Sequence, residues 1–471
     1  MKPVQFLPIA SALALAACAA GPDYVAPAPP PAAAGAFTAA GPDVTTAEAG
    51  AGPWWKLYDD PVLDGLVADA LAANTDIRVA VARLDRARAA LREAGADRLP
   101  RTGIDAGANY GRLPAGQRAP GAPREDWQVD GGLSVAYEVD LFGRVTRNIE
   151  AGRGDVGAAA ADADAARVTI VSDTIAAYVD AAAAAEQLKV ATEIVELLDR
   201  SVTLTTKRFE AGRANKLDVA RLAALRDQRK ADIPPLVARR QAALFALATL
   251  TGRAPAELPD TASARATTPR VVQPIPVGDG AALLARRPDV RAAERRLAAA
   301  TARIGVATAA LYPRISLGGS VGSTGTGFGD SFGAGPLRWL LGPLISWTFP
   351  NQTAERARIA AARADEQAAL ATFDGTVLRA LQETETALSA YTQAIERRRA
   401  LASARDAAAT AARIVRARQR EGTVDFLEVL DAERTFAATE ADVAASDAGI
   451  AAAQIALFRA LGGGWQVPAA Q

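Results

Sequence analysis

The chain has 471 residues with 53 Lys+Arg and 53 Asp+Glu, so it lacks the basic excess that nucleic-acid phosphates require. It has no histidine and one cysteine, which removes the commonest general base and metal ligand, an internal disulfide and a thiolate cluster. Aromatic residues make up only 5% of the chain, and alanine, the strongest helix former, is abundant. We therefore expect a mostly helical protein that is not an enzyme.

The first residues have the pattern of a secretion signal. Lys2 precedes an apolar run that is too short to span a bilayer, so residues 1–17 are predicted to be a signal peptide. The run ends in LAAC, which resembles a bacterial lipobox, so Cys18 is expected to receive a thioether lipid and become the mature N-terminus. Ala19, in place of Asp, points to the outer membrane. The alternative is an ordinary signal peptide followed by an incidental cysteine. Apart from the lipid, no cofactor or metal is expected.

A Pro/Ala-rich segment follows the cysteine. Residues 18–53 are predicted to form an extended tether without a core. No later stretch holds eighteen uninterrupted apolar residues, so we expect no transmembrane helix.

The rest of the chain is a tandem duplication. Residues 76–104 align with 289–317 at an offset of 213, and residues 207–219 align with 417–429 at an offset of 210. Because the order of the matches is kept, chance is a poor explanation. The predicted organisation is a first repeat over 54–260, a second over 261–465 and a tail over 466–471.

Each repeat begins with a helix that stops at a proline. These helices are expected at 62–99 and 281–311. Two period-2 stretches follow in each repeat, separated by a turn-rich loop, as membrane β-strands require. The predicted strands are 102–111 and 127–137 in the first repeat, and about 314–323 and 337–349 in the second. Within them, Ile315, Leu317 and Val321 share one face, as do Val129, Leu133, Val135 and Tyr137.

Long helices follow the strands. Residues 144–212 and 351–467 contain no proline, and a helix of about 68 residues would be roughly 100 Å long. A shorter helix over 216–252 is expected to break at Pro234-Pro235. This helix and the helix over 62–99 could stack end to end and lie alongside the long helix of the same repeat.

Four strands cannot close a barrel, and open sheet edges are not tolerated in lipid. The chain must therefore share its barrel with other copies. Three copies would give twelve strands. The aromatic residues Trp127, Tyr137, Trp339 and Trp347 are expected to anchor such a barrel at the bilayer interface.

Several strings match one known family over nearly the whole mature chain. They are LAAC-AAGPDY at the mature start, YEVDLFGR at 137–144, RRPDVRAAERRL from 286, EGTVDFLEVLDAERT at 421–435 and ALGGGW at 460–465. The chain resembles the TolC-like outer-membrane factors, in particular their lipid-anchored multidrug (RND-type) efflux branch. One departure is Phe-Pro-Asn-Gln at 349–352, where many relatives have a Phe-Asp-Gly-Gly type of turn.

The resemblance implies a homotrimer. Its twelve-stranded β-barrel would lie in the outer membrane and continue as a twelve-helix barrel in the periplasm. It would act as the exit duct of a tripartite efflux system, conducting small molecules such as drugs passively, and its partners would be a periplasmic adaptor and an inner-membrane transporter.

The helix-turn-helix tips carry the candidate gate. Gly212 and Gly422 are expected to reverse the chain at the ends of the long helices. By resemblance, Asp218, Glu428 and Asp431 would form the periplasmic aperture constriction, the last two sharing a helix face. Arg213, Lys216 and Arg420 are candidates for closing ion pairs. The alternative is that these carboxylates are ordinary solvated residues on a charged helix end.

Other functions compete with this interpretation. The nearest is the duct of a type I protein secretion system, which would have the same fold. A periplasmic adaptor would have one helical hairpin and lack the four strands. A trimeric adhesin would have its strands at the C-terminus, and an enzyme would need a cofactor motif or a nucleophile that this sequence lacks.

Overall fold

The computed structural model describes residues 19–28, 31–47, 53–112, 114, 116, 120–121, 123–325, 337–421, 423–424 and 426–463. The predicted signal peptide, Cys18, Gly422 and the C-terminal tail lie outside these residues. The chain divides into two compact units, each of which is considered by itself. The first contains residues 1–27, 83–160 and 292–374; the second contains residues 28–82, 161–291 and 375–471.

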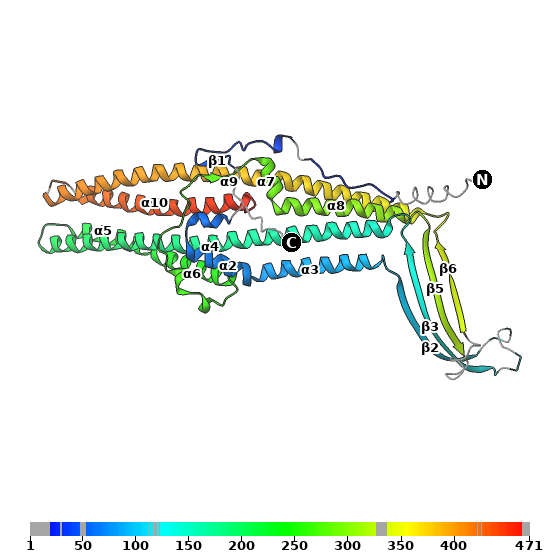
Figure 1. The fold of residues 1–471 in the computed structure, drawn as a ribbon. Helices are drawn as coiled ribbons and strands as arrows, with labels where there is room; N and C mark the ends of the chain where they lie inside the picture. Colours follow the sequence, from blue (N-terminus) through cyan, green and yellow to red (C-terminus); the bar gives the residue numbers. More distant parts are fainter. Residues whose placement is uncertain are drawn as a thin grey trace. The chain divides into compact units, whose positions relative to one another are not determined.

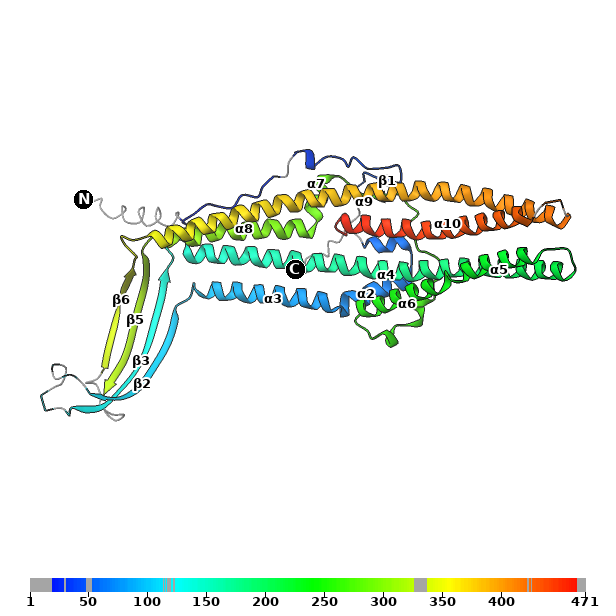
Figure 2. The ribbon, with the colours of Figure 1, turned by 180° about the vertical axis from the view of Figure 1, so that it is seen from behind.

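A four-stranded antiparallel sheet belongs to the first unit. Its order is β2-β3-β5-β6, and the strands form a single layer in both views (Figures 1 and 2). The strands are β2 (Arg101–Arg112), β3 (Glu125–Val139), β5 (Arg314–Gly325) and β6 (Leu337–Ser346). β6 ends before the predicted residue 349 because its last partner, Arg314, begins β5 and pairs with Ser346.

Helices make up most of the remaining chain (Figure 1). Their bounds are α2 (Pro61–Ala73), α3 (Thr75–Ala96), α4 (Arg144–Glu210), α5 (Lys216–Lys230), α6 (Ile233–Leu250), α7 (Gly280–Arg286), α8 (Pro288–Ala309), α9 (Thr353–Glu421) and α10 (Phe426–Ala460). The 67 residues of α4 give a helix of about 100 Å. The helices predicted over 62–99 and 281–311 are each a pair, α2 with α3 and α7 with α8. The helix predicted over 216–252 is broken, as expected, into α5 and α6.

Asn74 separates α2 from α3 and also joins α3 to α6. Its side-chain oxygen accepts hydrogen bonds from the backbone N–H groups of Asp76 (2.8 Å) and Ile77 (3.3 Å), which caps the start of α3. Its amide nitrogen donates to the carbonyl of Leu250 at 2.9 Å, at the end of α6. Asn74 is 3% exposed. One buried side chain therefore pairs unsatisfied backbone N–H groups at the start of α3 and a carbonyl at the end of α6.

Arg287 makes the corresponding junction in the second repeat, 213 residues later. Its guanidinium donates to the carbonyl of Ala460 at 2.9 Å, at the C-terminus of α10, where a cation is favoured. It also donates to the carboxylates of Asp289 and Glu383, each at 2.7 Å. Burial opposes the charge of Arg287, but these carboxylates outweigh it and raise the pKa of the guanidinium. The helices α8 and α10 therefore meet end to end, as α3 and α6 do.

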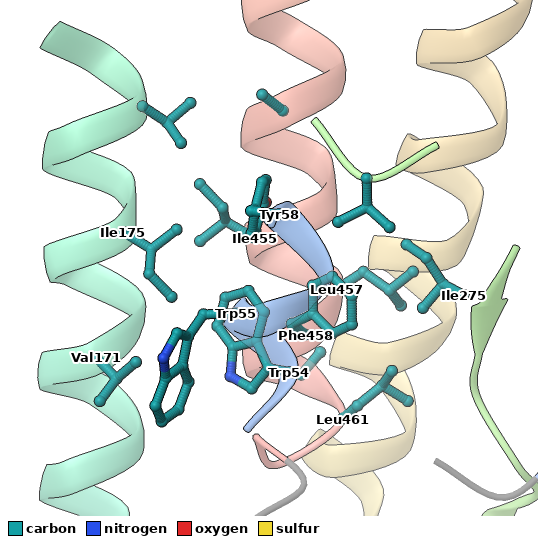
Figure 3. Packing of buried hydrophobic residues seen from close by; sticks show 14 of the residues in the cluster. Trp54, Trp55, Tyr58, Val171, Ile175, Ile275, Ile455, Leu457, Phe458 and Leu461 are labelled. Carbon is teal, nitrogen blue, oxygen red and sulfur yellow. The ribbon is translucent and has the colours of Figure 1, made fainter. Parts of the chain in front are cut away.

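The core of the second unit is built around a short 3₁₀ turn, η2 (Trp54–Tyr58). Trp54 stacks on Phe458 with ring centroids 4.4 Å apart. Figure 3 shows η2 between α4, which contributes Val171 and Ile175, and α10. Burying side chains of this size stabilises the fold by about 1.5–3 kcal/mol each, so this cluster ties the segment before α2 to both repeats.

The proline-rich segment packs against helices instead of forming the coreless tether that the sequence predicted. Val44–Thr45 (β1) pairs in parallel with Ile275–Pro276 (β4). The backbone N–H groups of Thr38 and Ala39 both donate to the Glu385 carboxylate at 2.8 Å, and Phe37 is buried. The sequence could not show this, because the partners lie more than 200 residues away.

Two helices, α4 and α10, contain eighteen-residue windows apolar enough for a membrane span, but 78% and 56% of those windows are buried inside the protein. Alanine-rich core helices have the same property. These windows are therefore weak support for a helical membrane span.

We expect Asn74→Ala to lower the free energy of unfolding by about 2 kcal/mol, because it removes a helix cap and a buried hydrogen bond together. Circular dichroism of the purified protein would report a lower thermal midpoint. Gln228→Ala, at an exposed helix position, is the control and should leave the midpoint unchanged. Equal midpoints for both variants would contradict the junction role of Asn74.

Candidate functional site

The sheet has one apolar face and one polar face, as two neighbouring rows of paired residues illustrate. One row joins Ile104, Leu133, Val321 and Trp339 across the four strands. The next row, on the opposite face, joins Asp105, Gly132, Gly322 and Arg338. Because directly paired residues of an antiparallel sheet share a face, the alternation extends along the sheet, with Leu340 and Leu344 of β6 as apolar exceptions on the polar face. It is the pattern of a barrel wall between lipid and a polar lumen.

The strand register also places the apolar residues predicted for β3 and those predicted for β5 on one face. Tyr137 pairs with Leu317, and Leu133 pairs with Val321, so both sets lie on the same face of the sheet. On that face, Trp339 is 74% exposed and Leu341 is 78% exposed within the single chain. So large an exposed apolar surface needs a covering, which lipid would supply.

Aromatic pairs lie at both ends of this sheet. Tyr110 and Trp127 approach at 5.7 Å near the loop end, and Phe142 stacks on Tyr312 at 4.6 Å where the strands meet the helices. Trp347, just past β6, stacks on Phe349 at 4.9 Å and donates to the carbonyl of Leu311 at 3.0 Å. Aromatic girdles at two levels are typical of a membrane barrel.

The outer edges of β2 and β6 have no partner strand among the described residues. Neighbouring strands alternate in direction, so β2 and β6 run in opposite directions. The β6 edge of one copy is therefore ready to pair in antiparallel fashion with the β2 edge of the next. Repeating this step closes a barrel whose strand number is a multiple of four.

The first tip is the turn between α4 and α5. Gly212 adopts a φ of +70°, and the N–H of Arg213 donates to the carbonyl of Arg208 at 2.7 Å. Asp218 is half-buried and accepts a hydrogen bond from the N–H of Asn215 at 3.3 Å, while Asn215 caps Leu217 at 3.1 Å. This capping box commits part of the Asp218 carboxylate to holding the turn.

The second tip is the turn between α9 and α10. Glu428 and Asp431 are both exposed, three residues apart on one face of α10. Arg420 is exposed and donates to the carbonyl of Arg416 at 3.4 Å. Within the described part of the chain, neither Arg420 nor the basic residues of the first tip, Arg213 and Lys216, forms an ion pair.

The two hairpins are held together by different mixtures of contacts. In the first, Ile194 and Leu198 of α4 pack on Leu222 and Leu225 of α5, and Ala437 of α10 joins this cluster. One ion pair, Arg226 with Asp199 at 3.0 Å, also links α5 to α4. In the second, three ion pairs link α9 to α10: Arg398 with Asp447 (3.1 Å), Arg405 with Glu440 (3.7 Å) and Arg416 with Glu433 (2.7 Å).

Sequence reasoning missed two of these features. Glu433 is 3% exposed and hydrogen-bonds Arg416, which raises the pKa of that guanidinium, yet nothing in a helix pattern marks this pair. The Asn215–Asp218 capping box, in contrast, has a visible signal in the three-residue spacing of a cap and an acid.

The residues that follow Cys18 contact the first unit at specific points. The N–H of Ala20 donates to the carbonyl of Phe142 at 3.0 Å, and Arg147, with a side chain 6% exposed, donates to the carbonyl of Ala20 (3.2 Å) and to Asp23 (2.6 Å). A Cβ on Gly143 would lie 2.8 Å from the Ala19 side chain. This segment is therefore fixed at the turn where β3 meets α4.

Comparisons with known proteins agree on one family. The family model described as "Outer membrane efflux protein" matches residues 66–253 and 281–463. The chain is 32% identical to the outer membrane protein OprJ of Pseudomonas aeruginosa, over 96% of this chain and 94% of that protein. It is 31% identical to the pyoverdine export outer membrane protein OpmQ of Pseudomonas putida, over 88% of each. The solved structure of the outer-membrane channel OprN superposes with a TM-score of 0.88 at 38% identity, covering 95% of this chain and 100% of that one.

Proposed function

The chain belongs to the outer membrane efflux protein family, and we propose that three copies of it form the gated exit duct of a tripartite efflux pump. It is an outer-membrane efflux channel of the TolC-like type, with a periplasmic helical extension. The trimer, the gate, the lipid anchor and the partners are what this proposal adds.

The observation that carries the proposal is the two-faced sheet with two open edges of opposite direction. Unpaired backbone groups each cost several kcal/mol in lipid, so the sheet must close. Two copies would give eight strands, the size of a barrel filled by its own side chains, whereas three give twelve and leave room for a lumen. The polar faces, rich in glycine and serine, would line that lumen.

Cargo would reach this duct from an inner-membrane transporter through a periplasmic adaptor. Several apolar side chains near the tips are exposed, among them Phe209, Leu217 and Leu427, as expected of a surface that binds another protein. Pyoverdine export is named for the relative OpmQ, and we propose that this chain conducts small molecules such as drugs or toxic solutes.

The tips would form the gate. We propose that Glu428 and Asp431 of three copies make stacked carboxylate rings at the periplasmic aperture, with Asp218 nearby as a capping residue. Arg213, Lys216 and Arg420, which have no ion-pair partner within the described chain, would pair between copies and hold the closed state. Exposed pairs contribute about 1 kcal/mol or less each, so adaptor binding could break them.

The assembly has a direct test. The mature protein, purified in detergent, is expected to have a native mass of three chains and to form a small cation-preferring conductance in planar bilayers. A monomer without conductance would overturn the shared barrel.

The gate is tested by the double variant Glu428→Gln/Asp431→Asn. It should lose most of its cation preference in a planar bilayer, because the carboxylate rings are gone, and the cognate adaptor should raise the conductance of the wild-type channel. Asp365→Asn, at an exposed position near the start of α9 and far from the tip, serves as the control. Unchanged selectivity in the double variant would refute the constriction.

We also propose that Cys18 carries a lipid. The hydrogen bonds that fix Ala20 and Asp23 at the β3–α4 turn would hold the anchor at the membrane end of the first unit. Intact mass spectrometry of the protein from cells should show two or three acyl chains, each adding about 0.8 kcal/mol of membrane affinity per buried methylene. Cys18→Ser should lack this mass. An unmodified Cys18 in the wild-type protein would disprove lipidation.

A further inference from the structure

A cavity of about 330 Å³ lies in the second unit where α5 and α6 meet, against α4 and α10. Its size is at the lower end of the range for small-molecule sites. The lining is mostly apolar, with contributions from three helices: Val190, Ala191 and Ile194 of α4, Leu236 of α6, and Ala444 and Ala445 of α10.

A proline pair opens this cavity. Pro234 and Pro235 have no N–H groups to donate to the carbonyls of the preceding turn, so α5 ends at Lys230 and α6 begins at Ile233. At the offset of 210 that relates the tips, the prolines correspond to Ala444 and Ala445, and α10 runs unbroken through both. The cavity therefore lies where the repeats diverge, between a broken helix and a straight one lined with small residues.

One polar group of the lining lacks a partner. The Nε of Arg229 is buried and has no hydrogen-bond acceptor among the described residues. The Nη1 of the same guanidinium lies 3.5 Å from the Asp232 carboxylate, and Asp442, an exposed acid of α10, also lines the cavity. Two carboxylates in the lining disfavour an anion, whereas the free Nε–H needs an acceptor. The matching ligand is neutral and apolar and carries one carbonyl or ether oxygen.

We propose that this cavity binds a small neutral apolar molecule with one hydrogen-bond acceptor, and that the bound molecule fastens the two tip hairpins to each other. Val190 and Ile194 line the cavity and also belong to the apolar contact between α4, α5 and Ala437 of α10. A ligand there would extend this contact. Its effect on opening rests on the proposed gate, but the binding does not.

The binding test uses 4-fluoroacetophenone as the probe and ¹⁹F line broadening as the measurement, with the full-length protein in detergent. Ala445→Phe should fill the cavity and weaken binding at least tenfold. Arg229→Met keeps the apolar stem but removes the donor, and should weaken binding about tenfold. Ala452→Phe, at an exposed position of the same helix, is the matched control and should bind like wild type. Equal broadening in all four proteins would mean partition into the micelle and would overturn the site.

Hydrogen exchange tests the fastening separately. With the probe bound, residues 187–194 and 441–445 should exchange several-fold more slowly in wild type and in Ala452→Phe, and at an unchanged rate in Ala445→Phe. Probe binding without any slowing on α10 would overturn the link between hairpins. Neither readout depends on stoichiometry or conductance, so a failure here is distinct from a failure of the efflux duct.

Discussion

The open edges of the sheet are the constraint on which the molecule depends. A sheet with one apolar face can lie in lipid only if every backbone group is paired, and β2 and β6 are left unpaired within one chain. Duplication pairs the inner edges of the strands, since each repeat supplies one pair of strands to the sheet. The outer edges of β2 and β6 can be paired only by other copies of the chain. Oligomerisation is therefore a condition of membrane insertion.

In each repeat, two shorter helices must meet end to end, and the backbone groups at their ends need hydrogen-bond partners. The two repeats meet this need at equivalent positions with different residues. Asn74 satisfies two helix ends by neutral hydrogen bonds, whereas Arg287 uses its charge against the carbonyl end of α10 and two carboxylates. Breaking the Arg287 network would strand a buried charge, so the second junction is the less tolerant of change. The segment before the first repeat then binds α9 through Glu385 and pairs with β4, joining the repeats.

The sequence predicted the four strands and the long helices because these depend on local patterns. Alternation shows a strand, and the absence of proline over 144–212 permits a long helix. Contacts between residues far apart in the sequence could not be predicted from local patterns. Asn74 looks like any polar helix residue until Leu250 is placed beside it, and nothing marks Thr38 as a donor to Glu385. At the candidate gate, the turn at Gly212 has a local signal, but the Arg416–Glu433 pair depends on how α9 folds back onto α10.

The differences between the two hairpins limit how an aperture made of them can work. In the proposed trimer, six hairpins would share one ancestral sequence, but the equivalent carboxylates differ: Asp218 caps its own turn, whereas Glu428 and Asp431 are exposed. The first hairpin is held by apolar packing and one ion pair, Arg226 with Asp199, and its second helix is interrupted near the prolines. In the second hairpin α10 is continuous and is linked to α9 by three ion pairs. An aperture lined by Glu428 and Asp431 would therefore carry its charge with three-fold, not six-fold, symmetry in the proposed trimer. Ionic strength would weaken the exposed Arg226–Asp199 pair of the first hairpin more than the Arg416–Glu433 pair of the second, because Glu433 is buried and buried pairs are screened less.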